Sequence, residues 1–164
     1  GDAKFGDLNI PFASVATDII SGTKKVFKDP DQIIAPTIRA SASFPGILEP
    51  TTIDNIPYCD GGASENVPVS SVKEMGADIV IAIDVIPSVI LSRSPSHMMA
   101  MVDRALDILL INEAKAQLDQ ADIVLKPLTE YFASRHFKHA SRMIELGIES
   151  VENQIDEIKK VIAL

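Results

Sequence analysis

The residues whose types and spacing could do chemistry are an aspartate and two glycines, Asp60-Gly61-Gly62. A short apolar run, 56–59, precedes the acid, so the carboxyl group stands where a predicted strand gives way to a turn. Glycines allow positive φ angles and a close approach by another group, and open α/β sheets bind ligands at the carboxyl ends of their strands. The same residues also suit a tight turn capped by the aspartate. Two hypotheses for Asp60 follow, a functional carboxylate and a turn cap.

A second acid, Asp18, also follows a predicted strand and precedes the turn signal Ser21-Gly22. An aspartate in that place usually accepts hydrogen bonds from the backbone of the turn. This is the role we predict for Asp18, with a site residue as the alternative.

Metal and cofactor chemistry is not predicted. Cys59 is the single cysteine, which excludes an intrachain disulfide and a cysteine-based zinc site. The three histidines, His97, His136 and His139, lack a metal-binding spacing with nearby acids, and no calcium-loop pattern is present.

The composition is that of a globular chain with an aliphatic core. Of 164 residues, 46% are hydrophobic and 23% are charged, which is enough apolar material for one domain. The net charge of −8 disfavours nucleic acid and anionic membrane surfaces as partners, but not a neutral lipid or ester. No apolar run reaches the length of about 18 residues that a membrane span needs, and no signal peptide is visible.

Hydrophobic periodicity and turn residues predict an alternation of strands and helices. The strand at 78–85 is apolar on both faces, which is typical of a parallel strand covered on both sides. Methionines at 98–101 are predicted to be core, with a lipid-binding surface as the alternative. The apolar stripe of the last helix is predicted to pack on a sheet, with an oligomer interface as the alternative. The predicted strands are 10–20 and 24–27 (an edge hairpin), 51–53, 58–60, 78–85 and 122–125; the predicted helices are 31–43, 68–75, 94–120 and 140–164; a turn lies at 54–55 and loops at 86–93 and 129–138.

Four segments, taken in this order, resemble the C-terminal half of a patatin-like phospholipase domain. They are Ala16-Thr17-Asp18 with Gly22, the Ala-Ser-rich segment 40–50, Asp60-Gly61-Gly62 with Asn66 and Pro68, and Gly76-Ala77-Asp78 before the strand at 79. The last helix, with Gly147 early in it, is also similar to small bacterial members. The resemblance covers most of residues 10–150.

The resemblance implies a three-layer α/β/α sandwich with a mostly parallel sheet, of which residues 1–164 would be the C-terminal part of a single domain. It also implies a Ser-Asp dyad that cleaves acyl esters of lipids without a cofactor. Carried onto this sequence, the dyad base is Asp60, and Gly61 and Gly62 leave room for the serine and the substrate.

The serine of that dyad belongs to a Gly-x-Ser-x-Gly motif, and residues 1–164 do not contain one. The glycine-rich oxyanion loop is also missing. We expect both to lie upstream of residue 1, so this chain by itself should be inactive. A sheet without its first strands would expose an edge, and we expect the chain to associate with its upstream half or to self-pair into a homo-oligomer.

Two other functions compete with the hydrolase. The first is a non-catalytic binding or scaffold module of the same fold. The second, a nucleotide-binding α/β domain, is disfavoured because Gly61-Gly62 does not supply the Gly-x-Gly-x-x-Gly turn. The predicted location is the cytoplasm or the periphery of a membrane.

Overall fold

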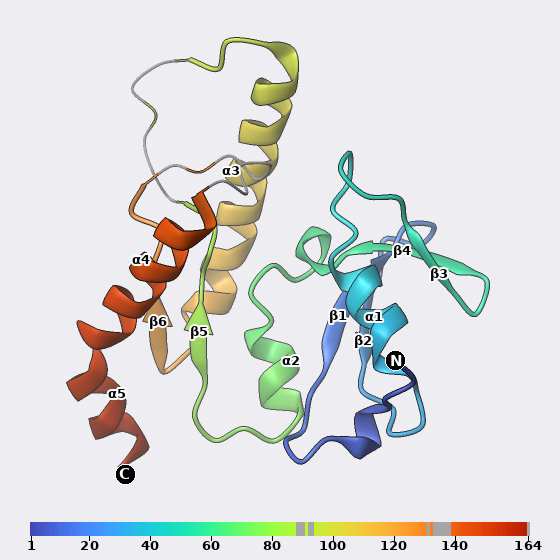
Figure 1. Ribbon diagram of the computed structural model, residues 1–164, viewed down its shortest axis with the longest axis horizontal. Helices are drawn as coiled ribbons and strands as arrows, with labels where there is room; N and C mark the ends of the chain where they lie inside the picture. The colour runs from blue at the N-terminus through green and yellow to red at the C-terminus, as the bar shows by residue number, and fades with distance from the viewer. Residues whose placement is uncertain (88–90, 92–93, 131, 133–138, 164) are drawn as a thin grey trace. The chain divides into compact units, whose positions relative to one another are not determined.

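The computed structural model describes residues 1–164 except 88–90, 92–93, 131, 133–138 and 164 (Figure 1). The chain divides into two compact units, Gly1–Pro68 and Val69–Leu164, and each is described by itself. That residues 1–164 belong to one domain stays a prediction. The predicted loops at 86–93 and 129–138, with His136, lie wholly or partly outside the described residues.

The first unit is built on a four-stranded antiparallel sheet in the order β2–β1–β4–β3. β1 and β2 form the predicted hairpin, with β2 at the edge of the sheet. In the centre, β1 pairs with β4 so that Ala16 lies opposite Asp60. The pairing therefore brings Asp60 beside the Ala-Thr-Asp segment. The strands are β1 (Ser14–Asp18), β2 (Lys24–Phe27), β3 (Thr51–Ile53) and β4 (Ile56–Asp60).

The turn between β3 and β4 consists of Asp54 and Asn55, with φ angles of 51° and 65°. Two successive positive φ angles are the mark of a type I′ hairpin turn, and short polar side chains tolerate them. The predicted turn is confirmed, and it sets the register in which Ile53 lies opposite Ile56.

One helix, α1 (Ile34–Ser41), completes the core of the first unit. The rings of Phe27 and Tyr58 meet edge to face, with their centroids 5.2 Å apart. Such aromatic pairs stabilise a core beyond the area that they bury. The buried cluster joins the helix to the sheet and comprises Phe5, Ala16, Phe27, Ile34, Ala40 and Tyr58.

The start of α1 differs from the predicted helix at 31–43. The backbone N–H of Asp31 donates to Oδ1 of Asp29 over 2.9 Å, which closes a turn ahead of the helix. Pro36 is the third helical residue, where its missing N–H has no intrahelical partner to lose.

The helical periodicity of this segment predicts one apolar face made of Ile33, Ile34, Ile38 and Ala42. The buried face of α1 differs from it. Thr37 is fully buried, whereas Ile38 is 46% exposed. The hydroxyl of Thr37 donates to the carbonyl oxygen of Ile34 over 2.8 Å, so it is buried without losing its hydrogen bond. Ile38 is left facing outward.

The second unit contains a two-stranded parallel sheet, β5 (Ile81–Ile83) with β6 (Ile123–Leu125). The long helix α3 (Met98–Leu118) connects the two strands, and α2 (Val69–Glu74) precedes them. The two strands and α3 form a βαβ crossover, because parallel neighbours need a long connection.

The predicted α/β class is confirmed, but a mostly parallel sheet is not what the described strands form. β5 and β6 are parallel, whereas β1–β2, β1–β4 and β3–β4 are antiparallel. The physical reason is that short turns join β1 to β2 and β3 to β4, and a short turn can only produce an antiparallel pair. The three-layer arrangement stays a prediction.

β5 is shorter than the predicted strand at 78–85, and it is not covered on both faces. Ala82 is 4% exposed, whereas Ile81 and Ile83 are 38% and 55% exposed. The helix α5 (Ile155–Ile162) packs Ile158 against Ile123 and Leu125 of the neighbouring strand.

The prediction that the methionines near the start of α3 are core residues is wrong. Met98, Met99 and Met101 are 80%, 46% and 58% exposed. The helix was predicted to begin at Ser94, whereas α3 begins at Met98. Nδ1 of His97 accepts the N–H of Ala100 over 3.2 Å and so caps the first turn of α3.

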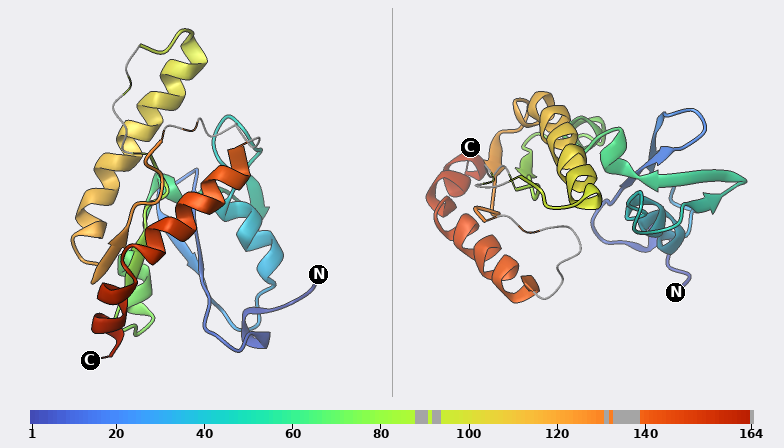
Figure 2. Two further views of the ribbon diagram at one scale, coloured as in Figure 1. Left: turned by 60° about the vertical axis from the view of Figure 1, so that its left-hand side comes forward. Right: turned by 90° about the horizontal axis from the view of Figure 1, so that it is seen from above.

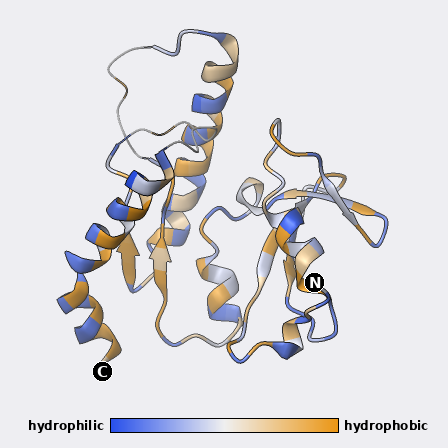
Figure 3. Ribbon diagram, viewed as in Figure 1, coloured by the Kyte–Doolittle hydropathy of each residue, from blue (hydrophilic) through white to orange (hydrophobic). Residues whose placement is uncertain are grey.

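The predicted helix at 140–164 is two helices, α4 (Ala140–Glu152) and α5, which follow one another end to end with a change of direction (Figure 2). Polar and apolar residues alternate along both (Figure 3). Packing on a sheet is confirmed for Ile158 of α5, which is 8% exposed, but Ile144 and Ile148 of α4 are 64% and 54% exposed.

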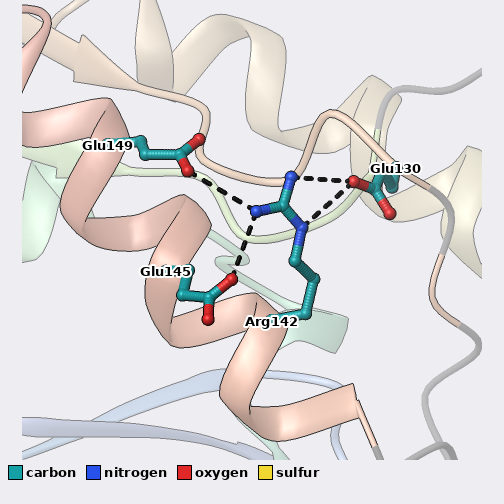
Figure 4. Close-up of polar contacts among 4 residues, drawn as sticks. All are labelled: Glu130, Arg142, Glu145 and Glu149. Atoms are coloured by element: carbon teal, nitrogen blue, oxygen red, sulfur yellow. Dashed lines mark hydrogen bonds and ion pairs between the residues drawn. The ribbon is translucent and has the colours of Figure 1, made fainter.

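The surface of α4 carries a small network of charges centred on Arg142 (Figure 4). Its guanidinium lies 3.1 Å from Glu130, 3.3 Å from Glu145 and 3.5 Å from Glu149. These pairs are exposed, so each contributes little to stability, but together they tie the segment after β6 to α4. None of the described helices is long and apolar enough to cross a membrane.

Replacing the central aromatic residue of the first unit tests this description of the core. We expect Phe27→Ala to lower the free energy of unfolding by about 3–5 kcal/mol, because it leaves a cavity under α1. Urea unfolding followed by tyrosine fluorescence measures the change. Ile20→Ala, at a turn position that is 78% exposed, is the control and should have little effect. Equal effects of the two substitutions would contradict the proposed core.

Candidate active site

Asp60 is the last residue of β4, and its backbone is held on both sides. Its N–H donates to the carbonyl oxygen of Ser43 over 3.0 Å, and its own carbonyl oxygen accepts the hydroxyl of Thr17 over 3.0 Å. The predicted position, where a strand gives way to a turn, is confirmed. A side chain on a backbone fixed in this way starts from a well-defined Cα position.

The carboxyl group of Asp60 is half-buried, and one of its oxygens is used. Oδ1 accepts the N–H of Gly62 over 2.7 Å, which is the predicted turn cap. Among the described residues, no hydrogen bond to Oδ2 is present. Burial raises the pKa of Asp60, and the hydrogen bond from Gly62 opposes part of that rise. The cap and the functional carboxylate are therefore compatible, because they use different oxygens.

A close approach to Gly61 is present, but the group that approaches is the backbone of β1, and the positive φ angles are absent. That the two glycines leave room for a serine and a substrate stays a prediction. The residues from Gly61 to Ala63 form one right-handed 3₁₀ turn. A Cβ atom built on Gly61 would overlap the carbonyl oxygen of Val15 and lie 2.8 Å from its carbonyl carbon. A glycine is needed here because the turn is pressed against the backbone of β1.

A polar network that the sequence did not reveal holds the residues that follow this turn, Ser64 and Glu65. The hydroxyl groups of Thr17 and Ser64 lie 2.8 Å apart, and Thr17 also donates to Asp60 as above. Next to Ser64, the carboxylate of Glu65 is buried at 2% exposure and lies 3.1 Å from Nζ of Lys24. These partners come from β1 and β2, so only the strand pairing brings them to the turn.

A groove of about 370 Å³ opens beside Asp60 within the first unit. Its walls are mainly apolar or small, and the exposed side chains of Phe12 and Ile38 contribute to them. Asp60, Gly61 and Gly62 form part of its lining. Glu65 also belongs to the lining, so the groove contains two carboxyl groups. A concave, largely apolar surface with few charged groups is suited to a ligand with a hydrocarbon portion.

Asp18 has the predicted structural role. Its Oδ1 accepts the N–H of Ile20 over 2.8 Å, and its Oδ2 accepts the hydroxyl of Ser21 over 2.7 Å. The hydrogen bond from Ser21 lowers the pKa of Asp18 in this exposed turn. A carboxylate with a lowered pKa is a weak base, so the pair of Ser21 and Asp18 is a turn device and not a nucleophile with its base.

Two other groups are set aside on chemical grounds. Cys59 is buried, and burial raises the pKa of its thiol, with the charge of Asp60 adding to the rise, so the thiol is neutral. Within the part of the chain that the structure describes, no three His, Cys, Asp or Glu residues form a group that could hold a metal ion.

Comparison with known proteins matches the first unit to one family. A model of the patatin-like phospholipases matches residues 4–73. This part of the chain is therefore similar to the patatin-like phospholipases. The patatin-like match begins ahead of β1 and ends in α2, so it contains Asp18, Asp60 and both glycines.

The individual relatives that this chain matches are much longer proteins. An uncharacterised NTE family protein of Mycobacterium tuberculosis is 34% identical over 83 residues, which are 51% of this chain and 22% of that protein. Patatin-like phospholipase domain-containing protein 6 of Homo sapiens is 37% identical over 86 residues, 51% of this chain and 6% of that protein. The lysophospholipase NTE1 of Yarrowia lipolytica is 48% identical over 48 residues, 29% of this chain and 3% of that protein.

The close approach at Gly61 gives a direct test of the patatin-like turn. We expect Gly61→Ala to destabilise the chain by about 2 kcal/mol or more, because the new methyl group meets backbone that cannot rotate away. Gly147→Ala in α4 is the matched control, since a Cβ there has nothing within 4 Å. It should stabilise the chain by up to about 1 kcal/mol through helix propensity. Urea unfolding distinguishes the two, and an innocuous Gly61→Ala would contradict the geometry.

The two acids should respond to pH in opposite directions. The folded pKa of Asp60 is raised, so the folded state binds its proton more tightly, and stability falls as pH rises from the unfolded pKa to the folded one. We therefore expect Asp60→Asn, whose amide oxygen can still accept from Gly62, to stabilise the chain more at pH 7 than at pH 3.

Asp18 supplies the opposite control in that experiment. Its pKa is lowered, so its contribution is present above the unfolded pKa and is lost as pH falls. Asp18→Asn should therefore destabilise the chain at pH 7 more than at pH 3. Urea unfolding at both pH values measures the changes, and a loss of stability in Asp60→Asn at pH 7 would show that the carboxylate acts mainly as a cap.

Proposed function

We propose that the protein to which residues 1–164 belong is a serine acyl hydrolase acting on lipid esters, with Asp60 as the base of a Ser-Asp dyad. Similarity to the patatin-like phospholipases supports a lipid hydrolase, and one relative is named a lysophospholipase. The observation that carries the proposal is the state of Asp60: a half-buried carboxyl with a raised pKa and an unoccupied Oδ2, in the wall of a mainly apolar groove.

The proposed chemistry follows from that state. Oδ2 of Asp60 takes the proton of the serine hydroxyl as the serine oxygen attacks the ester carbonyl carbon. The proton then passes to the oxygen of the leaving alcohol as the carbon–oxygen bond breaks, and the acyl group remains on the serine. Water reverses the sequence: Asp60 takes a proton from water, the acyl-enzyme is hydrolysed, and the serine regains its proton.

A carboxylate is a weak base for a serine hydroxyl, so its environment has to compensate. Burial raises the pKa of Asp60, which makes its carboxylate a stronger proton acceptor. The hydrogen bond from Gly62 holds the carboxyl group in one orientation while using only Oδ1. We propose that the serine, in a Gly-x-Ser-x-Gly motif, and the donors to the oxyanion come from outside residues 1–164.

A non-catalytic binding module is the second candidate. It is favoured by the cap, because the hydrogen bond from Gly62 to Asp60 gives the carboxyl group a structural use without any reaction. Under this proposal the groove would hold a ligand, and the charge of Asp60 would not be needed for turnover.

Substitution of Asp60 in the full-length protein separates the two candidates. We expect Asp60→Asn to lower kcat for a short-chain ester by a factor of about 100 or more, because the amide cannot take the serine proton. KM should change much less, since Asn is close to Asp in size. Asp18→Asn is the control and should leave kcat within a few-fold. Unchanged kcat in Asp60→Asn would contradict the proposed base, and wild-type protein without ester hydrolysis or serine labelling by a phosphonate would favour the binding module.

A further inference from the structure

A buried ion pair stands shortly after Asp60 in the first unit. Glu65 is 2% exposed, and its Oε2 lies 3.1 Å from Nζ of Lys24 in β2. Removing a carboxylate and an ammonium group from water cancels most of their attraction, so an apolar pair of similar volume would stabilise the fold at least as well. A polar pair does fix the distance between two defined points of the chain. Stability therefore does not account for this pair, and a positioning role does.

The chain between Asp60 and Glu65 is closed into one turn by its own backbone. The N–H groups of Ser64 and Glu65 both donate to the carbonyl oxygen of Gly61, over 3.0 and 2.8 Å. Within the same turn, the N–H of Gly62 donates to Oδ1 of Asp60 over 2.7 Å. The direction of the Gly62 N–H therefore depends on where the end of the turn, Glu65, is held.

Two neighbouring strands hold that end of the turn. Lys24 of β2 pairs with Thr17 of β1, and paired residues place their side chains on the same face of a sheet. The hydroxyl of Thr17 lies 2.8 Å from that of Ser64 and donates to the carbonyl oxygen of Asp60. Lys24 contacts Glu65, the next residue. Side chains from β1 and β2 thus hold two consecutive residues of the turn.

We infer that the ion pair of Lys24 and Glu65 positions the carboxyl group of Asp60. By holding the end of the turn, the pair keeps the N–H of Gly62 directed at Oδ1, which leaves Oδ2 available to the serine of the proposed dyad. The inference rests on the proposed function for this role of Oδ2. Lys24 and Glu65 are positioning residues, because they act through the turn and not on the reacting atoms.

The pH dependence of the reaction separates positioning from a direct effect of charge. Burial raises the pKa of Asp60, and the hydrogen bond from Gly62 lowers it. A turn released from Lys24 weakens that hydrogen bond and raises the pKa of Asp60 further, whereas loss of the negative charge of Glu65 by itself would lower it. The other charged or titratable side chains on the elements around Asp60 are Asp18 of β1, Lys24 and Lys25 of β2, Arg39 of α1, and Tyr58 and Cys59 of β4.

The main test is Glu65→Met in the full-length protein, which keeps the side-chain length and removes the carboxylate. We expect kcat for a short-chain ester to fall about tenfold or more, with KM within a few-fold, because the carboxyl group of Asp60 is misaligned. The acid limb of the pH profile of kcat/KM, where Asp60 becomes protonated, should move to higher pH by about half a pH unit or more. Instability alone would lower the amount of folded enzyme without moving that limb.

Two milder variants and a matched control accompany Glu65→Met. Glu65→Gln keeps a polar group of the same size and should show smaller changes of the same sign. Lys24→Arg keeps the positive charge and should leave kcat and the acid limb close to those of the wild type. Lys25→Met removes the same charge from the next position of β2, where Nζ lies 5.7 Å from the centroid of the Phe27 ring, and should also leave both unchanged.

Amide hydrogen exchange of the full-length variants measures the turn without reference to catalysis. We expect the N–H groups of Gly62 and Ser64 to exchange about fivefold faster or more in Glu65→Met, because their hydrogen bonds depend on the end of the turn. In Lys25→Met the exchange of both should equal that of the wild type.

Three results would overturn the inference. An acid limb that moves to lower pH in Glu65→Met would assign the effect to charge alone. Unchanged exchange at Gly62 in that variant would show that the pair does not hold the turn. Equal losses in Lys25→Met would assign the effect to the charge of β2 as a whole. Wild-type protein without ester hydrolysis would instead contradict the proposed function, and the exchange at Gly62 would then decide by itself whether the pair positions the turn.

Discussion

The pairing of β1 with β4 is the contact on which the candidate site depends. It sets Ala16 opposite Asp60 and presses the turn at Gly61 against the backbone of Val15, where no side chain has room. The same pairing brings Thr17 to the carbonyl oxygen of Asp60 and to Ser64. The carboxyl group thus stands on a backbone fixed by hydrogen bonds from separate elements, while one of its oxygens stays available. A preorganised carboxylate of this kind is what a proton transfer at a defined distance requires.

This arrangement makes ionisation of the Asp60 carboxyl group less favourable. Burial disfavours the ionised form of Asp60, and one hydrogen bond from Gly62 offsets only part of the effect. Asp18, at the end of the neighbouring strand, has the reverse balance, because the hydrogen bonds to its side chain, that of Ser21 above all, outweigh the effect of burial. Two aspartates at the ends of paired strands therefore differ in basicity because of their surroundings. The one whose ionised form is disfavoured, Asp60, is the one that lines the groove.

The sequence predicted the local features of this site well. The hairpin of β1 and β2, the turn at Asp54 and Asn55, the strand ending at Asp60 and the turn role of Asp18 all follow from residue types within a few positions. Features that depend on exposure were predicted poorly. Ile38, Met98, Ile83 and Ile148 were expected to be buried because they are apolar, and all are exposed. Periodicity identifies an apolar face, but it does not say whether anything covers that face.

By itself, the sequence determined most of the elements, the family resemblance and the place of Asp60 at the end of a strand. Each of these rests on short-range steric preferences and on the order of motifs along the chain. Only the tertiary structure decided that Asp60 keeps one oxygen unoccupied, that Gly61 is required by contact with Val15, and that Thr17, Lys24 and Glu65 support the turn. Those properties arise from residues far apart in sequence, and their distances and burial are set by strand register and packing, which no local pattern encodes.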